Sequence, residues 1–337
     1  MTKKHVAVVG ATGAVGRTMM SILDERDFPI ENLRLFASER SAGQVVETRW
    51  GGITVEDLAQ ADPAGIEIAL FSAGGARSRE FAPRFAGAGA IVVDNSSAFR
   101  MEPKVPLVVV GINDAAAFDH EGIVANPNCT TMALMMGIGP LHAAAGLVSM
   151  TASSYQSVSG SGMTGMDELT RQIEALGADR AALAEGGWKD PGGSVYSRPI
   201  GWNVIPLAGN PAEQGYTDEE WKLVNETRKI LNAPDVQVEP LCVRVPVMVG
   251  HGIAATAFFS RPVGVEEAIA LIDATPGASV WTDRVPTPLD SAGIDDVLVG
   301  RVRATVGTPG GISLWTVGDN LRKGAALNTV QIAELFV

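Results

Sequence analysis

Residues 5–16 read HVAVVGATGAVG, an apolar strand-like run that ends in three glycines spaced as GxxGxxG. The residues that follow have helical spacing over 13–25, so the stretch predicts a strand, a tight turn and a helix. In such a unit Gly10 allows the turn, Gly13 lets the backbone approach a pyrophosphate, and Gly16 lets the helix pack closely on the strand. The helix would then offer its first N–H groups to the phosphates. The spacing departs from the usual G-x-G-x-x-G, so a glycine-rich turn without a ligand is the alternative.

Apolar runs and helical segments alternate through the first third of the chain. Further strands are expected at 32–37, 66–72, 90–94, 106–110 and 123–126. Near-continuous apolar strands of this kind are typical of a parallel sheet covered on both faces by helices. One of the candidate helices, 76–88, contains Pro83, which predicts a kink or a break there.

The pattern changes near residue 150, where we expect an α+β domain with an antiparallel sheet. Strand-like segments occur at 148–158, 235–247, 252–260 and 296–303, and helical segments at 163–178, 218–231 and 264–273. Residues 185–215, rich in Gly, Pro and Asn, predict a long loop. A strand over 312–318 and a helix over 321–336 complete the expected elements.

The composition is that of a globular protein, because 46% of the 337 residues are hydrophobic and 19% are charged. The net charge of −12 argues against nonspecific binding to nucleic acid or to an anionic membrane. No uncharged apolar stretch approaches the roughly 18–20 residues of a transmembrane helix, and the first apolar run is too short for a signal peptide. The two cysteines exclude a disulfide scaffold, and the four histidines lack metal-ligand spacing, so no metal is expected. We therefore expect a soluble, cytoplasmic protein.

The sequence NPNCTT, residues 126–131, follows a short strand and precedes a helical run. Cys129 is therefore expected at a helix N-terminus, where the macrodipole lowers the pKa of a thiol. The N–H groups near residues 128–130 would also stabilise an oxyanion. An inert buried residue is the alternative for a lone cysteine, and Cys242, in an apolar strand, fits that alternative.

A nucleophilic thiolate needs a base or a cationic partner. His251 lies between an apolar strand and a glycine, a position at which a histidine is usually accessible. His5 begins the chain, His120 lies in an acidic loop and His142 lies on a helix. His251 is therefore the candidate partner of the thiol.

The adenosine ribose of a dinucleotide is expected at the end of the second strand, where residues 37–41 read ASERS. Arg40, with the hydroxyl groups of Ser38 and Ser41 beside it, suits a 2′-phosphate and so favours NADP. Glu39 is the acidic residue that an NAD site usually has there. A solvated turn without a ligand is the third interpretation.

Six motifs resemble, in this order, those of the aspartate-β-semialdehyde dehydrogenase family: VVGATGAVG, DNSSAFRM, ANPNCTT, SYQSVSGSG, CVRVPV-x₃-GH and DNLRKGAALN. The resemblance runs from residue 5 to the C-terminus. The family makes aspartate semialdehyde from aspartyl phosphate with NADPH. This reaction lies on the route to lysine, through diaminopimelate, and to methionine, threonine and isoleucine.

The resemblance implies an α/β fold similar in plan to that of glyceraldehyde-3-phosphate dehydrogenase. A Rossmann-like, parallel-sheet domain over 1–127 would bind NADP(H). An α+β catalytic and dimerisation domain would cover 128–315, and a C-terminal helix over 316–337 would return to the first domain. The expected partners are the small-molecule substrate, phosphate and a second copy of the chain in a homodimer, with a tetramer as the alternative. Nucleic acid and membrane are not expected partners.

Carried over position by position, the resemblance implies the chemistry of three residues. Cys129 would be the nucleophile that forms the acyl thioester, and His251 would accept and donate protons. Gln156 would hydrogen-bond the reacting substrate.

The resemblance also implies four charged substrate ligands. Arg244 would clamp the α-carboxylate, for which a guanidinium fork is well shaped. Glu219 would meet the α-ammonium group, and Lys222, three residues on and so on the same helical face, would meet the phosphate. Arg100 would be the second phosphate ligand. An ordinary surface ion pair is the alternative for Glu219 and Lys222.

Three features together predict the cofactor contacts: the glycine-rich turn, the end of the second strand and the resemblance. The predicted contacts are Gly10, Thr12, Gly13, Ala14, Val15, Ser38, Arg40, Ser41, Ser159, Gly160 and Asn320. The last three would lie by the nicotinamide.

Two stretches depart from the family pattern. Residues 110–113 replace a stretch that usually contains Pro-Glu, and residues 251–254 lack the Ser and the acid that often follow the histidine. Both bear on rate and stability more than on reaction type.

Two other functions compete with this one. The first is the related reductase that acts on N-acetylglutamyl phosphate. That substrate has no free α-ammonium group, so Glu219 would lack its purpose. The second is a cofactor-binding relative without catalysis, against which the joint presence of Cys129, Gln156, Arg244 and His251 argues.

Overall fold

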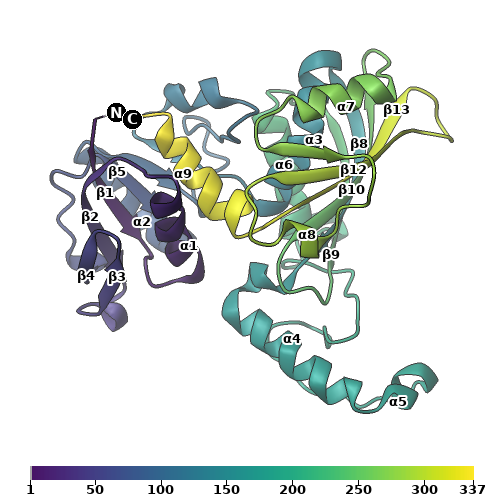
Figure 1. Ribbon diagram of the computed structural model, residues 1–337, viewed down its shortest axis with the longest axis horizontal. Coiled ribbons are helices and arrows are strands. Elements are labelled where there is room, and N and C mark those ends of the chain that lie inside the picture. The colour runs from purple at the N-terminus through teal and green to yellow at the C-terminus, as the bar shows by residue number, and fades with distance from the viewer. Residues whose placement is uncertain (1) are drawn as a thin grey trace. The chain divides into compact units, whose positions relative to one another are not determined.

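The computed structural model describes residues 2–337 and divides into two compact units (Figure 1). The first unit contains a seven-stranded sheet. This unit comprises Met1–Met135, Asn225–Pro234 and Leu321–Val337, and the second unit comprises Met136–Val224 and Asp235–Asn320. Helices α3 (Cys129–Ala145) and α6 (Asp218–Ile230) each have residues in both units.

The sheet of the first unit has the order β3-β4-β2-β1-β5-β6-β7. Its strands are β1 (Lys4–Val9), β2 (Ile30–Ala37), β3 (Val45–Thr48), β4 (Gly51–Asp57), β5 (Ile68–Phe71), β6 (Ile91–Asp94) and β7 (Ile123–Ala125). Each neighbouring pair is parallel apart from the β3–β4 hairpin, so the predicted parallel sheet is confirmed. The hairpin at its edge was not predicted.

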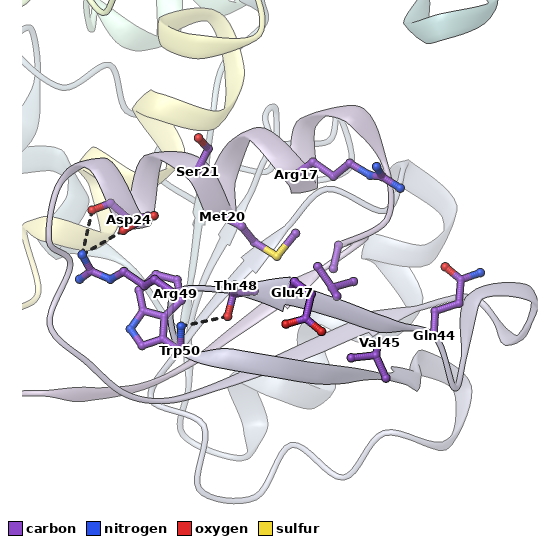
Figure 2. Close-up of a pocket in the computed structure, with 12 residues that line it drawn as sticks. Arg17, Met20, Ser21, Asp24, Gln44, Val45, Glu47, Thr48, Arg49 and Trp50 are labelled. Atoms are coloured by element: carbon purple, nitrogen blue, oxygen red, sulfur yellow. Dashed lines mark hydrogen bonds and ion pairs between the residues drawn. The ribbon is translucent and has the colours of Figure 1, made fainter.

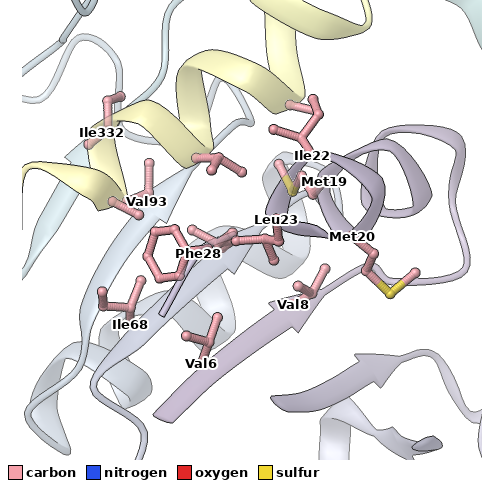
Figure 3. Packing of buried hydrophobic residues seen from close by; sticks show 14 of the residues in the cluster. Val6, Val8, Met19, Met20, Ile22, Leu23, Phe28, Ile68, Val93 and Ile332 are labelled. Atoms are coloured by element: carbon pink, nitrogen blue, oxygen red, sulfur yellow. The ribbon is translucent and has the colours of Figure 1, made fainter. Parts of the chain in front are cut away.

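Helices cover both faces of this sheet, as predicted. α1 (Ala14–Glu25) and α9 (Leu327–Glu334) pack on one face, and α2 (Gly75–Gly87) packs on the other. Alternate residues of β1 join the two clusters, since Val6 packs with α1 and α9 (Figure 3) and Ala7 packs with α2. The central strand is therefore buried on both sides, which explains its continuous apolar sequence.

Two details of the first unit differ from the sequence prediction. The expected strand over 106–110 is absent from the described residues, where Leu107 forms only an isolated bridge to Ala125. The segment is buried, which accounts for its apolar sequence. Its backbone bonds β7 only at Ala125, and the side chains of Asn113 and Asn328 bond other polar groups of the segment. Helix α2 runs without a break through Pro83, which the prediction had placed at a kink or break.

The second unit contains a six-stranded sheet of order β11-β12-β13-β10-β8-β9. Its strands are β8 (Leu147–Gln156), β9 (Gln237–Arg244), β10 (His251–Phe259), β11 (Ala278–Trp281), β12 (Val297–Ala304) and β13 (Gly311–Gly318). The predicted antiparallel sheet is only partly right, because both outer pairs, β8–β9 and β11–β12, are parallel. A parallel pair needs a crossover, and α4 (Gly162–Gly177), the long loop and α6 supply it between β8 and β9.

The remaining helices of this unit are α5 (Arg180–Glu185), α7 (Val265–Asp273) and α8 (Pro288–Ser291). α3 packs on one face of the sheet, where Gly137 lies against Leu314 and Thr316 of β13. The residues over 185–215 form the predicted long loop, with one short 3₁₀ turn, Glu213–Gly215. Among residues 2–337 no helix is both long and apolar enough to cross a membrane.

Candidate active site

The glycine-rich turn joins β1 to α1 in the first unit. Gly10 has φ of +87°, and a Cβ there would lie 2.3 Å from the carbonyl oxygen of Ser72. A Cβ on Gly16 would lie 2.2 Å from the carbonyl oxygen of Gly10, so the helix packs on the strand as closely as predicted. A Cβ on Gly13 would approach that oxygen only to 3.3 Å, so the packing constrains Gly13 much less. Gly13 precedes α1, whose first N–H groups are open to phosphates.

The end of β2 lies beside this turn. The hydroxyl of Thr12 donates a hydrogen bond to Ser41 Oγ over 3.3 Å. Ser38 precedes a single 3₁₀ turn, Glu39–Ser41, and the side chains of Glu39 and Arg40 are both exposed. The structure thus brings the two predicted parts of the cofactor site together, and it leaves both the acidic and the basic candidate accessible.

A groove of about 450 Å³ runs between α1 and the β3–β4 hairpin (Figure 2). Arg49 in its wall pairs with Asp24 at 3.0 Å and with Asp27 at 2.6 Å, and its guanidinium lies 4.8 Å from the Trp50 ring centroid. These contacts neutralise Arg49, so Arg49 itself offers little net charge to a phosphate. Arg49 therefore does not replace Arg40 as the candidate for the 2′-phosphate.

Cys129 begins helix α3, as predicted, and is partly exposed. Asn128 caps the helix, because its Oδ1 accepts from the Thr130 N–H at 2.9 Å. The backbone N–H of Asn128 donates to Glu226 Oε2 at 2.6 Å. Two of the three amides expected to stabilise an oxyanion are therefore already bonded within the chain. The prediction of an oxyanion site formed by the amides of residues 128–130 is wrong for 128 and 130.

Arg100 is buried in the same unit and held by three hydrogen bonds. Its Nε donates to the Asn126 carbonyl at 2.9 Å, its Nη2 to the Asn95 carbonyl at 3.0 Å, and its Nη1 to Glu226 Oε1 at 3.1 Å. A guanidinium has five N–H donors, so each terminal nitrogen keeps one more. A pair of donors on the two terminal nitrogens suits an anion that accepts two hydrogen bonds, as the predicted phosphate would. Glu226 could not be identified from local sequence, because its partners Arg100 and Asn128 are distant in the chain.

His251, in the second unit, begins β10 and is only 1% exposed. Its Nδ1 accepts a hydrogen bond from the backbone N–H of Ser157 at 3.1 Å, so the neutral ring carries its proton on Nε2. Burial, and then the positive charge of Arg244, lower the pKa of His251 to about 3. The neutral imidazole is therefore a hydrogen-bond donor at Nε2.

Arg244, at the end of β9, lies close to His251. Its Nη1 donates to the Ser157 carbonyl at 2.6 Å. A Cβ on Gly160 would lie 3.2 Å from Arg244 Nη1 and 3.4 Å from His251 Nε2, so the glycine keeps this space clear. Within residues 2–337, Arg244 Nε and His251 Nε2 are buried without a hydrogen-bond partner. Two unpartnered donors, one on each of the side chains that border Gly160, point to a ligand that accepts hydrogen bonds.

Gln156 pairs with Arg244 across the parallel strands β8 and β9. It is 1% exposed, and its Nε2 donates to Ser154 Oγ at 3.2 Å. Asn320 bonds Ser159, through a contact of 2.8 Å from Nδ2 to Oγ, and its Oδ1 accepts from the Gly250 N–H at 2.9 Å. The structure thus gathers Gln156, Ser159, Gly160, Arg244, His251 and Asn320 at one end of the sheet.

Glu219 and Lys222 share one face of α6, as their spacing predicted. Lys222 Nζ donates to Glu219 Oε1 at 2.6 Å and to Asp218 Oδ2 at 3.2 Å. Burial alone would lower the pKa of Lys222, but the two carboxylates outweigh it and raise the pKa. Lys222 therefore stays positively charged. Both residues belong to the second unit, whereas Arg100 and Cys129 belong to the first.

Family models match both parts of the chain. Residues 5–120 match the NAD binding domain of semialdehyde dehydrogenases, and residues 138–323 match the dimerisation domain of the same enzymes. The fold and the site thus define the class, an NAD(P)-dependent semialdehyde dehydrogenase with a separate dimerisation domain.

The relatives narrow the class. Aspartate-semialdehyde dehydrogenase of Corynebacterium melassecola is 51% identical over 342 residues, with 98% of this chain and 99% of the relative covered. The enzyme of Streptomyces akiyoshiensis is 50% identical over 338 residues, with 98% of each covered. The solved aspartate semialdehyde dehydrogenase II of Vibrio cholerae, complexed with ASA, has a TM-score of 0.93 at 41% identity and covers 100% of this chain and 98% of that one. The chain belongs to the aspartate-semialdehyde dehydrogenase family, whose members are phosphorylating, NADP-dependent oxidoreductases of amino-acid biosynthesis.

Proposed function

We propose that Cys129, His251 and Gln156 carry out the family's reductive dephosphorylation of L-aspartyl 4-phosphate to L-aspartate 4-semialdehyde. The observation that carries this proposal is the pair of buried, unpartnered donors among the described residues, Arg244 Nε and His251 Nε2, on the two side chains that border Gly160. A substrate with a carboxylate and a reacting carbonyl supplies the acceptors that these donors need.

The first step is attack of the Cys129 thiolate on the acyl carbon. The C–S bond forms and the bond from that carbon to the phosphate oxygen breaks, so phosphate leaves with the electron pair. The two remaining N–H donors of Arg100 suit the leaving phosphate, and Lys222 adds a second positive charge. The product of this step is a thioester on Cys129.

NADPH, when bound, supplies the hydride that converts the thioester to the aldehyde. His251 donates a hydrogen bond from Nε2 to the reacting oxygen as negative charge develops on it, which fits the tautomer that the Ser157 amide fixes. The amide of Gln156 hydrogen-bonds the same group. Collapse of the tetrahedral species breaks the C–S bond and returns the thiolate of Cys129.

Arg244 and Glu219 suit the two charges at the α-carbon. Arg244 is buried and keeps Nε for the carboxylate, while its Nη1 is fixed by the Ser157 carbonyl. Glu219 already accepts from one ammonium group, that of Lys222, and would share its carboxylate with the substrate's α-ammonium. N-acetylglutamyl phosphate lacks that group, so the arrangement favours the aspartyl substrate.

The cofactor residues are those of the glycine-rich turn, the β2 end and the Ser159–Gly160 turn with Asn320. Because Gly10 and Gly16 are required by packing, Gly13 is the glycine whose Cβ position is left for a pyrophosphate. Arg40 is exposed beside the turn and suits a 2′-phosphate, which favours NADP over NAD. Glu39, equally exposed, is the competing residue.

A homodimer through the open face of the second sheet completes the proposal, with a tetramer needing a further contact surface. Leu241 is 46% exposed and Tyr155 39%, although both lie in strands, and Tyr155 packs on Trp315 with ring centroids 5.6 Å apart. An apolar sheet face of this kind is typical of an interface, and the dimerisation-domain match covers it. A thiol nucleophile that must stay reduced favours the cytoplasm.

The test follows NADPH absorbance with aspartate semialdehyde, phosphate and NADP⁺, beside the N-acetylglutamate analogue. Phosphate-dependent NADPH formation is expected with aspartate semialdehyde, and little or none with the analogue. A preference for the analogue, or activity retained by Cys129→Ala, would overturn the proposal.

A further inference from the structure

Glu226 of α6 joins two segments of the first unit through one buried carboxylate. Its side chain is 1% exposed. Oε1 accepts from Arg100 Nη1 at 3.1 Å, and Oε2 accepts from the Asn128 N–H at 2.6 Å. Asn128 in turn caps the helix that begins at Cys129. We propose that Glu226 is a positioning residue, which sets the phosphate-binding fork of Arg100 and the backbone of the nucleophile together.

The Glu226 carboxylate acts by orienting the Arg100 guanidinium rather than by adding charge to the phosphate site. Glu226 cancels much of the positive charge of Arg100, so its presence does not strengthen the attraction of phosphate. Instead, Glu226 holds one N–H of Arg100 Nη1, while backbone carbonyls hold the other two bonded N–H groups. The three bonds together fix the guanidinium plane and so determine where its two remaining N–H groups point. This inference rests on the proposed roles of Arg100 and Cys129.

The next turn of the helix supports the same segment. Lys229 Nζ donates to the carbonyl oxygens of Arg100, Glu102 and Val105, each at 2.7 Å. The helix therefore holds Arg100 by its side chain through Glu226 and by its backbone through Lys229. Two independent contacts from one rigid element are what a preorganised ligand fork requires.

Glutamine at position 226 is the sharp perturbation because it is nearly isosteric. Its amide has one acceptor oxygen and one NH₂ donor, so it satisfies either Arg100 or the Asn128 N–H and opposes the other with a donor. Glu220, on the same helix, is the matched control. It is 5% exposed, and its oxygens accept from the Thr217 N–H at 2.7 Å and the Cys242 N–H at 2.8 Å, away from Arg100.

The experiment compares Glu226→Gln with Glu220→Gln in the phosphorylating direction, with aspartate semialdehyde, phosphate and NADP⁺. We expect Glu226→Gln to raise the KM for phosphate roughly tenfold or more while the KM for aspartate semialdehyde changes little. Glu220→Gln should lower Tm by a similar amount and leave the phosphate KM nearly unchanged. In an Arg100→Ala background, Glu226→Gln should add almost nothing to the phosphate KM.

Each outcome decides the inference. An active wild type in which Glu226→Gln leaves the phosphate KM unchanged overturns the positioning role alone. A wild type without phosphate-dependent activity overturns the proposed function, and this inference with it. If Glu226→Gln does not fold, Glu226→Asp takes its place, because it keeps the charge on a side chain one methylene shorter. The same rise in phosphate KM, cancelled by Arg100→Ala, is expected, and additive effects in the double variant overturn the proposal.

Discussion

The two cysteines differ most sharply in how their thiols should react with iodoacetamide in the native protein. Neither forms a disulfide, but Cys242 is fully buried in β9 whereas Cys129 is partly exposed. Burial raises the pKa of the Cys242 thiol from 9.0 to about 12. Only a thiolate is alkylated at an appreciable rate.

This shift gives the size of the effect. At about pH 8, a thiol with the ordinary pKa has roughly one tenth of its population as thiolate, whereas a thiol with a pKa near 12 has about one part in 10⁴. Cys242 should therefore react about 10³-fold more slowly than an ordinary thiol, before any steric protection is counted. In a Cys129→Ser variant, native protein should stay unlabelled until denaturant is added.

The assay measures labelled peptides by mass spectrometry over time, with activity followed in parallel. Wild type should lose activity as one equivalent of label enters at Cys129, and Cys242→Ala should behave in the same way. Labelling of Cys242 in native Cys129→Ser at the rate of an ordinary thiol would refute the burial argument. Loss of activity without labelling of Cys129 would refute its role as nucleophile.

Four further results are expected. Because the pKa of His251 falls from 6.5 in the unfolded chain to about 3 on folding, its contribution to stability is complete above about pH 6.5 and declines as the pH falls toward 3. As the pH falls from about 6.5 toward 3, the Tm of wild type should drop more steeply than the Tm of His251→Asn. Parallel curves of Tm against pH would contradict the lowered pKa of His251. Gly16→Ala should unfold the first unit, whereas Gly13→Ala should fold with nearly the wild-type Tm but bind NADPH weakly, as titration would show. Arg40→Ala should collapse the ratio of kcat/KM for NADPH over NADH by about ten- to a hundredfold, and an unchanged ratio would mean that the 2′-phosphate is not recognised there. Arg244→Lys keeps the charge but loses the fork, so kcat/KM for aspartate semialdehyde should still fall, and full activity would remove the proposed clamp.

The sequence predicted what depends on near neighbours in the chain. The strand–turn–helix unit at Gly10–Gly16 and the placement of Cys129 at a helix start both follow from spacing within a few residues. The strand predicted over 106–110 was wrong because an apolar run indicates burial and does not specify a strand. In this buried segment the side-chain amides of Asn113 and Asn328 bond the backbone. The parallel outer pairs of the second sheet could not be predicted, since pairing joins segments far apart in sequence.

The site shows the same division. The helix start at Cys129 was predictable, but the loss of the Asn128 amide to Glu226 was not, because the two residues are 98 positions apart. The proton of His251 is likewise assigned by the Ser157 N–H, 94 positions away. Residue type and local spacing named the chemical groups, and only the fold determined which of their atoms remain available.

The amide side chains beside β7 have a consequence for solubility. β7 ends the seven-stranded sheet, and an uncovered end strand invites pairing with another chain. Here the segment after Pro106 bonds β7 by its backbone, and Asn113 and Asn328 occupy the next polar groups of that segment. The sheet therefore ends in side-chain carboxamides, which cannot continue a β-ladder. These amides, rather than a further strand, close this edge to pairing with another chain.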